Sequence, residues 1–122
     1  MSPGPRVLVA LAGVGGCAGV ALAAASAHIG GPNLATAAYF LLFHAPALLG
    51  VALAADLTTL PRRPTLAAGA LLALGVALFS GALALGALAE WRPVPMAAPT
   101  GGFLLMGGWL LLAGNAVFAR AR

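Results

Sequence analysis

The chain has 122 residues, of which 62% are hydrophobic and only 7% are charged, and its formal net charge is +4. An average soluble domain has roughly 25% charged residues, so this chain holds too few polar side chains to coat a water-soluble surface. Composition therefore excludes a soluble globular protein, and it predicts a single integral membrane domain covering residues 1–122 with the lipid bilayer as its surroundings.

The positive charge does not indicate nucleic-acid binding. All six basic residues are arginines that stand singly or in pairs at the ends of apolar runs, with no basic stripe and no interleaved aromatic side chains. They are Arg6, Arg62, Arg63, Arg92, Arg120 and Arg122. This placement is typical of membrane topology signals, so we expect no nucleic-acid partner.

The first half of the chain has no Lys, Arg, Asp or Glu between Arg6 and Asp56, a stretch of 49 residues. One helix of that length would measure about 74 Å, far more than the roughly 30 Å of hydrocarbon in a bilayer. The Gly-Gly-Pro-Asn sequence at 30–33 favours a turn, which predicts two spans, 7–27 and 34–55. The first run is longer than the apolar core of a usual secretory signal, so we favour a retained span over a cleaved leader.

The second half contains two more uncharged apolar runs, which predict spans over 66–89 and 100–119. Prolines and arginines make residues 56–64 a connecting loop, and Trp91, Arg92 and three prolines make 90–99 an interfacial loop. The runs lack the period-two alternation of strands. The predicted fold class is therefore an all-α membrane protein, a four-transmembrane-helix bundle.

Orientation follows from the arginines, because positive residues in short loops are retained on the cytoplasmic side. The N-terminus, the middle loop and the C-terminus hold five of them, and the two remaining loops hold one. We therefore expect both termini to be cytoplasmic.

Small residues spaced four apart indicate faces where membrane helices pack closely. The third span has such a ridge at Gly69, Ala73, Ala77 and Gly81, and the first span has Gly15 and Gly19, continued by two alanines. These ridges are the predicted helix-packing sites, either within one chain or between two.

His44 lies at the middle of the second span, and an ionisable residue at that depth is a candidate functional site. We expect a neutral imidazole that points into the bundle, with one donor and one acceptor to satisfy. Its expected partner is Ser80, about 4 Å from the middle of the expected third span, or a nearby backbone carbonyl. Trp109 is expected to point its indole donor into the bundle. Two interpretations stay open for this candidate intramembrane polar site: a contact that fixes helix register, or a proton relay.

No catalytic pattern accompanies these polar residues. The sequence contains no HExxH motif, paired carboxylates, Ser-His-Asp set or phosphate-binding loop, so we expect no enzyme activity, no cofactor and no metal. His28 and His44 differ in depth by roughly 15 Å, which excludes a haem ligated by both.

Three stretches resemble a known family: AYFLLFHAPALLGVALA in the second span, LFSGALALGAL in the third, and APTGGFLLMGGWLLLAG leading into the fourth. They are similar to the domain of unknown function 423 family, small four-helix inner-membrane proteins of bacteria with transmembrane protein 256-like relatives in animals. The resemblance implies this fold and the bacterial inner (plasma) membrane, and it implies no reaction.

The expected function is therefore that of a non-enzymatic accessory or structural protein that acts by helix packing. Its partners would be a second copy, giving a homo-oligomer, or a larger membrane complex. The alternative is a small transporter or channel subunit that uses His44.

Overall fold

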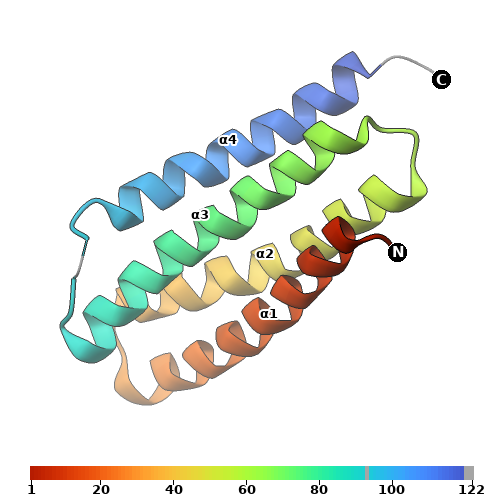
Figure 1. Ribbon diagram of the computed structural model, residues 1–122. Helices are drawn as coiled ribbons and strands as arrows, with labels where there is room; N and C mark the ends of the chain where they lie inside the picture. Colours follow the sequence, from red (N-terminus) through yellow and green to blue (C-terminus); the bar gives the residue numbers. More distant parts are fainter. Residues whose placement is uncertain (93, 120–122) are drawn as a thin grey trace.

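The computed structural model describes residues 1–92 and 94–119 and consists of four long helices (Figure 1). They are α1 (Pro3–Ile29), α2 (Pro32–Leu57), α3 (Arg62–Ala89) and α4 (Ala97–Phe118). The described part of the chain contains no strand. Each helix is long and apolar enough to cross a bilayer, which confirms the predicted all-α fold with four candidate transmembrane helices.

The helix ends differ little from the expected spans. The first three expected spans lie inside α1, α2 and α3, and α4 begins three residues before the expected start at Thr100. Between α1 and α2 the chain turns within Gly30 and Gly31, whose φ angles are 82° and 96°. Glycine adopts these angles without steric cost, and Pro32 then fits the first turn of α2 because its missing N–H would have no helical partner there.

The four helices form two hairpins that pack through α2 and α3. The pair α1 and α2 lies on one side, α4 lies on the far side of α3, and α1 also touches α3 (Figure 1). Within the described helices, no Cα atom of α4 comes within 8 Å of one in α1 or α2. Among the four described helices, none covers α4 on its far side from α3. The start of α1 and the end of α4 lie at the end of the bundle that holds the α2–α3 loop (Figure 1).

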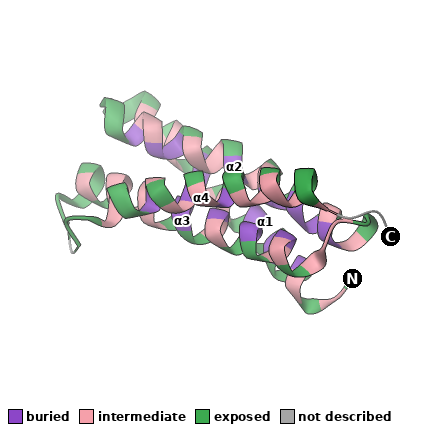
Figure 2. Ribbon diagram, turned by 90° about the horizontal axis from the view of Figure 1, so that it is seen from above, coloured by how far each residue is buried: buried purple, intermediate pink, exposed green. Residues whose placement is uncertain are grey.

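The core is a narrow seam between the helices, and Figure 2 shows that buried residues occupy only part of each helix. Its members are apolar residues from all four helices: Leu8, Ala12, Leu48, Val51, Ala52, Leu72, Val76 and Leu105. Most other large apolar side chains are exposed. That arrangement suits a lipid environment, in which apolar surface needs no cover.

Polar contacts tie the helices together at the end that holds the termini. Arg62 lies 3.6 Å from the Asp56 carboxylate, donates to the carbonyl of Ala55 at 3.0 Å, and also contacts the Ser2 hydroxyl. On the other side, the Asn115 amide of α4 donates to the hydroxyl of Thr65 in the first turn of α3, at 2.8 Å. These bonds join α1, α2, α3 and α4 at one level.

The backbones of α3 and α4 approach each other closely at glycines that do not belong to the predicted ridges. A Cβ atom built on Gly101 would lie 2.6 Å from the carbonyl oxygen of Gly75 and 2.5 Å from the amide nitrogen of Phe79. One built on Gly108 would lie 3.2 Å from the carbonyl oxygen of Ala68. At Gly101 any side chain would therefore collide with the α3 backbone, and at Gly108 an added methyl group would require a small shift of Leu72 and the α3 backbone.

Only some residues of the two predicted small-residue ridges pack against another helix of the chain. A Cβ on Gly69 would lie 2.7 Å from Leu8 of α1, and one on Gly19 would lie 2.9 Å from Leu42 of α2. In contrast, a Cβ on Gly81 would meet nothing within 4 Å, so this end of the third-span ridge is open.

The remaining ridge residues are also packed only loosely or are exposed. A Cβ on Gly15 would reach only an ordinary contact of 3.8 Å with Leu41, Ala73 is half-buried, and Ala77 is exposed. Within the chain, the third-span ridge therefore packs at its Gly69 end and faces open space toward Gly81, so packing between two chains stays a prediction for that end.

Candidate functional site

His44 lies at the middle of α2 and is only 6% exposed. Its Nδ1 atom lies 2.7 Å from the carbonyl oxygen of Phe40, one turn earlier in the same helix. The indole Nε1 of Trp109, on α4, donates to the Nε2 atom at 3.2 Å. Both ring nitrogens therefore have partners inside the protein.

These two partners determine the tautomer of the imidazole. A carbonyl oxygen can only accept a hydrogen bond, so Nδ1 of His44 carries the hydrogen, and an indole N–H can only donate, so Nε2 is the acceptor. A neutral ring with one donor and one acceptor meets both requirements. A proton added to Nε2 would displace the Trp109 indole.

Aromatic rings extend this contact across three helices. Phe40 stacks on the His44 ring with centroids 5.9 Å apart, and Phe79 of α3 lies 4.4 Å from Phe40 on the same measure. The Trp109 ring completes the row, tilted by 54° to the imidazole. Trp109 thus reaches α2 with its side chain although the α4 backbone does not approach α2.

Of the two partners that the sequence suggests for His44, the nearby backbone carbonyl is present, at Phe40, and Ser80 is not a partner. Its hydroxyl is buried and donates to the carbonyl oxygen of Ala37 at 2.9 Å. Because α3 begins at Arg62, four residues before the expected Leu66, Ser80 lies about 7 Å from the middle of the helix. It therefore contacts α2 about two turns away from His44, toward the end of the bundle opposite the termini.

A cavity of about 160 Å³ lies beside His44, between α1, α2 and α3. Its other walls are apolar and include three residues of the predicted ridges, Gly15, Ala73 and Ala77. An apolar cavity offers water too few hydrogen-bond partners to hold it. Within residues 1–92 and 94–119, no buried side-chain nitrogen or oxygen lacks a hydrogen-bond partner, and no three His, Cys, Asp or Glu side chains gather closely enough to hold a metal ion.

Four apolar spanning helices and a hydrogen-bonded intramembrane histidine define a small polytopic α-helical membrane protein. A family model described as protein of unknown function (DUF423) matches residues 18–102, which is more than half of the chain, and the chain belongs to this family. The match confirms the family resemblance of the sequence and includes His44 and Ser80, while Trp109 lies beyond it. No curated protein and no solved structure gives a significant match.

Proposed function

We propose that the protein is a non-enzymatic accessory membrane protein, which acts by packing its helices against a second copy or against a subunit of a larger membrane complex. The observation that carries the proposal is the internal use of His44. Both of its nitrogens bind groups of the same chain, so the deepest ionisable side chain supports the contact between α2 and α4. The indole N–H of Trp109 occupies the one ring nitrogen that could take up a proton, and it cannot itself accept one, so proton transfer at Nε2 would first require this contact to open.

The outer face of α4 is the surface that we propose for docking. Phe103, Leu110 and Val117 repeat every seven residues and are 71%, 73% and 74% exposed. On the same helix, a Cβ built on Gly107 or Gly114 would meet nothing within 4 Å. Large apolar residues beside uncovered glycines favour close packing of another transmembrane helix.

We infer that the termini are cytoplasmic and that the membrane is the inner (plasma) membrane of a bacterium. Five arginines belong to the N-terminus, the α2–α3 loop and the C-terminus, and positive residues in short segments are retained in the cytoplasm. The family resemblance supports the bacterial location.

Cysteine cross-linking in native membranes, followed by mild-detergent purification and mass identification, tests the docking face. Leu110→Cys in a Cys17→Ala background places a single thiol on α4, since Cys17 is the only cysteine. Val14→Cys, on an α1 position that is 68% exposed, is the matched control. We expect one stoichiometric adduct, to a second copy or to one other membrane protein, from the α4 position only. The same adducts from both positions, or none from either, would contradict the proposal.

A second candidate function, a small transporter or channel subunit, is favoured by the cavity beside His44. Proton flux into liposomes that contain the purified protein separates the two. An accessory protein should give no flux above empty liposomes. A flux that His44→Gln abolishes while the protein still folds would replace the accessory function with the transport function.

A further inference from the structure

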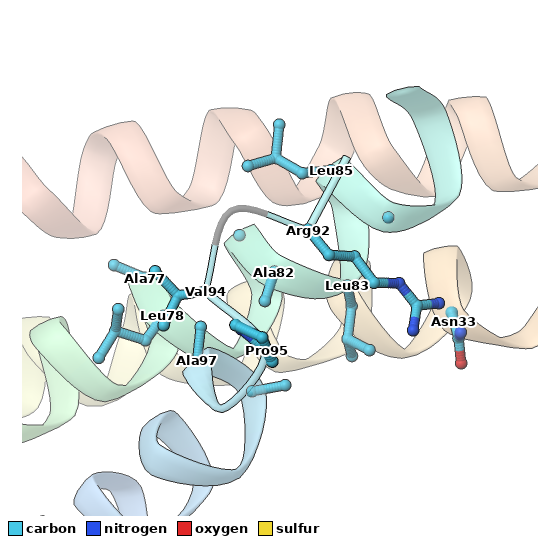
Figure 3. Close-up of a pocket in the computed structure, with 13 residues that line it drawn as sticks. Asn33, Ala77, Leu78, Ala82, Leu83, Leu85, Arg92, Val94, Pro95 and Ala97 are labelled. Atoms are coloured by element: carbon cyan, nitrogen blue, oxygen red, sulfur yellow. The ribbon is translucent and has the colours of Figure 1, made fainter. Parts of the chain in front are cut away.

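A cavity of about 310 Å³ lies at the end of the bundle opposite the termini (Figure 3). It is formed by the second half of α3, the α3–α4 loop, the start of α4, and Asn33 in the first turn of α2. Its walls are mostly apolar and include Ala77, Gly81 and Val94. Its volume is at the lower end of the range for small-molecule sites.

Arg92 supplies the charge of this cavity. Its side chain extends past Gly86, where a Cβ atom would lie 3.3 Å from the guanidinium Nε, and Figure 3 shows the guanidinium directed toward Asn33. Among the described residues, the one ion pair is between Arg62 and Asp56, so the guanidinium of Arg92 has no carboxylate partner there. Its neighbour Glu90 does not line the cavity.

The apolar part of the cavity continues along α3. Ala77 borders this cavity, the cavity beside His44, and an apolar hollow of about 570 Å³ between α1 and α3. All three spaces thus share Ala77 as a wall residue. The open end of the small-residue ridge, at Ala77 and Gly81, forms part of the apolar wall of the cavity that holds Arg92.

We propose that this cavity binds one anionic phospholipid. The phosphate diester contacts the guanidinium of Arg92 and the amide of Asn33, and an acyl chain lies over Gly81 and Ala77. An uncompensated guanidinium and an amide donor suit a phosphate, because charge-assisted hydrogen bonds are the strong ones. A lipid with a net negative charge should bind more tightly than a zwitterionic one, because a zwitterionic headgroup carries its own cation beside the phosphate.

The depth of the site also suits a lipid. Trp91 precedes Arg92 and is 57% exposed, and tryptophan concentrates at the level of the headgroups. From there the apolar walls on α3 lead toward the middle of the bilayer. The proposal goes beyond the proposed function, because its ligand is a lipid and its surface is α3 rather than the outer face of α4.

Native mass spectrometry of the full chain in mild detergent, titrated with dioleoyl phosphatidylglycerol or dioleoyl phosphatidylcholine, tests the charge requirement. We expect phosphatidylglycerol to bind more tightly, and Arg92→Gln to weaken it about fivefold, the usual effect of one basic residue near anionic lipid. Arg63→Gln removes an exposed arginine at the other end of the bundle and should leave binding unchanged. Equal affinity for the two lipids, or equal effects of the two substitutions, would overturn the proposal.

Gly81→Leu tests the acyl-chain position. Gly81 lines the cavity and a Cβ there meets nothing within 4 Å, so a leucine side chain would extend into the cavity, and we expect at least a tenfold loss of phosphatidylglycerol binding. Gly13→Leu, at an equally open position on α1, should have no effect. Glycerol phosphate that competes as well as the intact lipid would overturn the acyl-chain contact. The wild-type protein could instead form a dimer through this cavity. If Gly81→Leu dissociates such a dimer while lipid binding persists, the occupant of the cavity is a second copy and the lipid proposal is overturned.

Discussion

Gly101→Ala should separate α3 from α4, because the added methyl group would meet backbone atoms that cannot rotate away. Its Cβ would lie 2.5 Å from the amide nitrogen of Phe79, 2.6 Å from the carbonyl oxygen of Gly75 and 3.0 Å from the Phe79 Cα atom. Ordinary van der Waals contact begins at 3.4 Å. The two helices must therefore move apart by roughly an ångström along this seam.

The expected loss in the free energy of unfolding is about 2–3 kcal/mol. Overpacking a tight contact costs about 1–3 kcal/mol, and the upper part of that range applies because no flexible side chain can absorb the strain. Lipid supplies no hydrophobic force that would hold α4 in place, so its attachment depends on this close packing and on a few hydrogen bonds.

The measurement is a titration from mild detergent into sodium dodecyl sulfate, followed by circular dichroism and tryptophan fluorescence. Gly102→Ala is the matched control, since it adds the same methyl group to the same helix where the nearest atom, of the Phe79 ring, lies at an ordinary contact distance of 3.9 Å. It should lose no stability, because alanine is the better helix former by about 1 kcal/mol. Equal unfolding midpoints for the two variants would refute the close approach of α3 and α4.

Three further predictions concern two interhelical hydrogen bonds and the membrane topology. His44→Leu removes the acceptor of the Trp109 indole and should cost about 0.6 kcal/mol in the same unfolding assay, with His44→Gln closer to wild type; a loss several times larger would contradict a single interhelical bond. Asn115→Leu should cost a similar amount, because α4 loses its bonds to the start of α3, and an unchanged midpoint would show that those bonds contribute nothing. Reporters fused after Arg122 and inserted within residues 56–64 should both read as cytoplasmic, and an external signal from either would exclude four spans with cytoplasmic termini.

The spans were predictable because a bilayer imposes a simple requirement on the sequence. Each span needs about 20 apolar residues without a formal charge. The charged residues Arg6, Asp56 and Glu90 leave uncharged runs between them that are long enough for such spans. The first turn was predictable because glycine is the residue that enters positive φ freely, as it does at Gly30 and Gly31.

The backbone carbonyl partner of His44 was predictable, but Trp109 as its interhelical partner was not, because that contact depends on the relative height of the helices. The polar loop residues Arg62 to Thr65 form the first turn of α3, which shifts the middle of that helix away from Ser80. Trp109 lies about 2 Å from the middle of α4 and is therefore level with His44. The sequence indicated His44 and Trp109 separately as candidate polar residues, but the hydrogen bond between them depends on how the helices are arranged in three dimensions.

The α3–α4 seam was missed for a related reason. The spacing of four marks one straight ridge, whereas the residues of α3 that meet α4, at 68, 72, 75 and 79, alternate between spacings of four and three. On α4 the matching glycines, Gly101 and Gly108, are seven apart. The partner helix determines which face of a glycine-rich helix packs, and the sequence of the chain alone does not show which helix is the partner.

The charges on the two connections opposite the termini have a consequence for how the chain enters the membrane. In the proposed orientation both connections must be carried across the bilayer during biogenesis. The turn at Gly30 and Gly31 carries no formal charge, and the α3–α4 loop carries Glu90 and Arg92, whose charges cancel. A membrane potential contributes about 2.3 kcal/mol per elementary charge and 100 mV, so it does no net work on either hairpin. Insertion should therefore proceed equally well in energised and de-energised membranes.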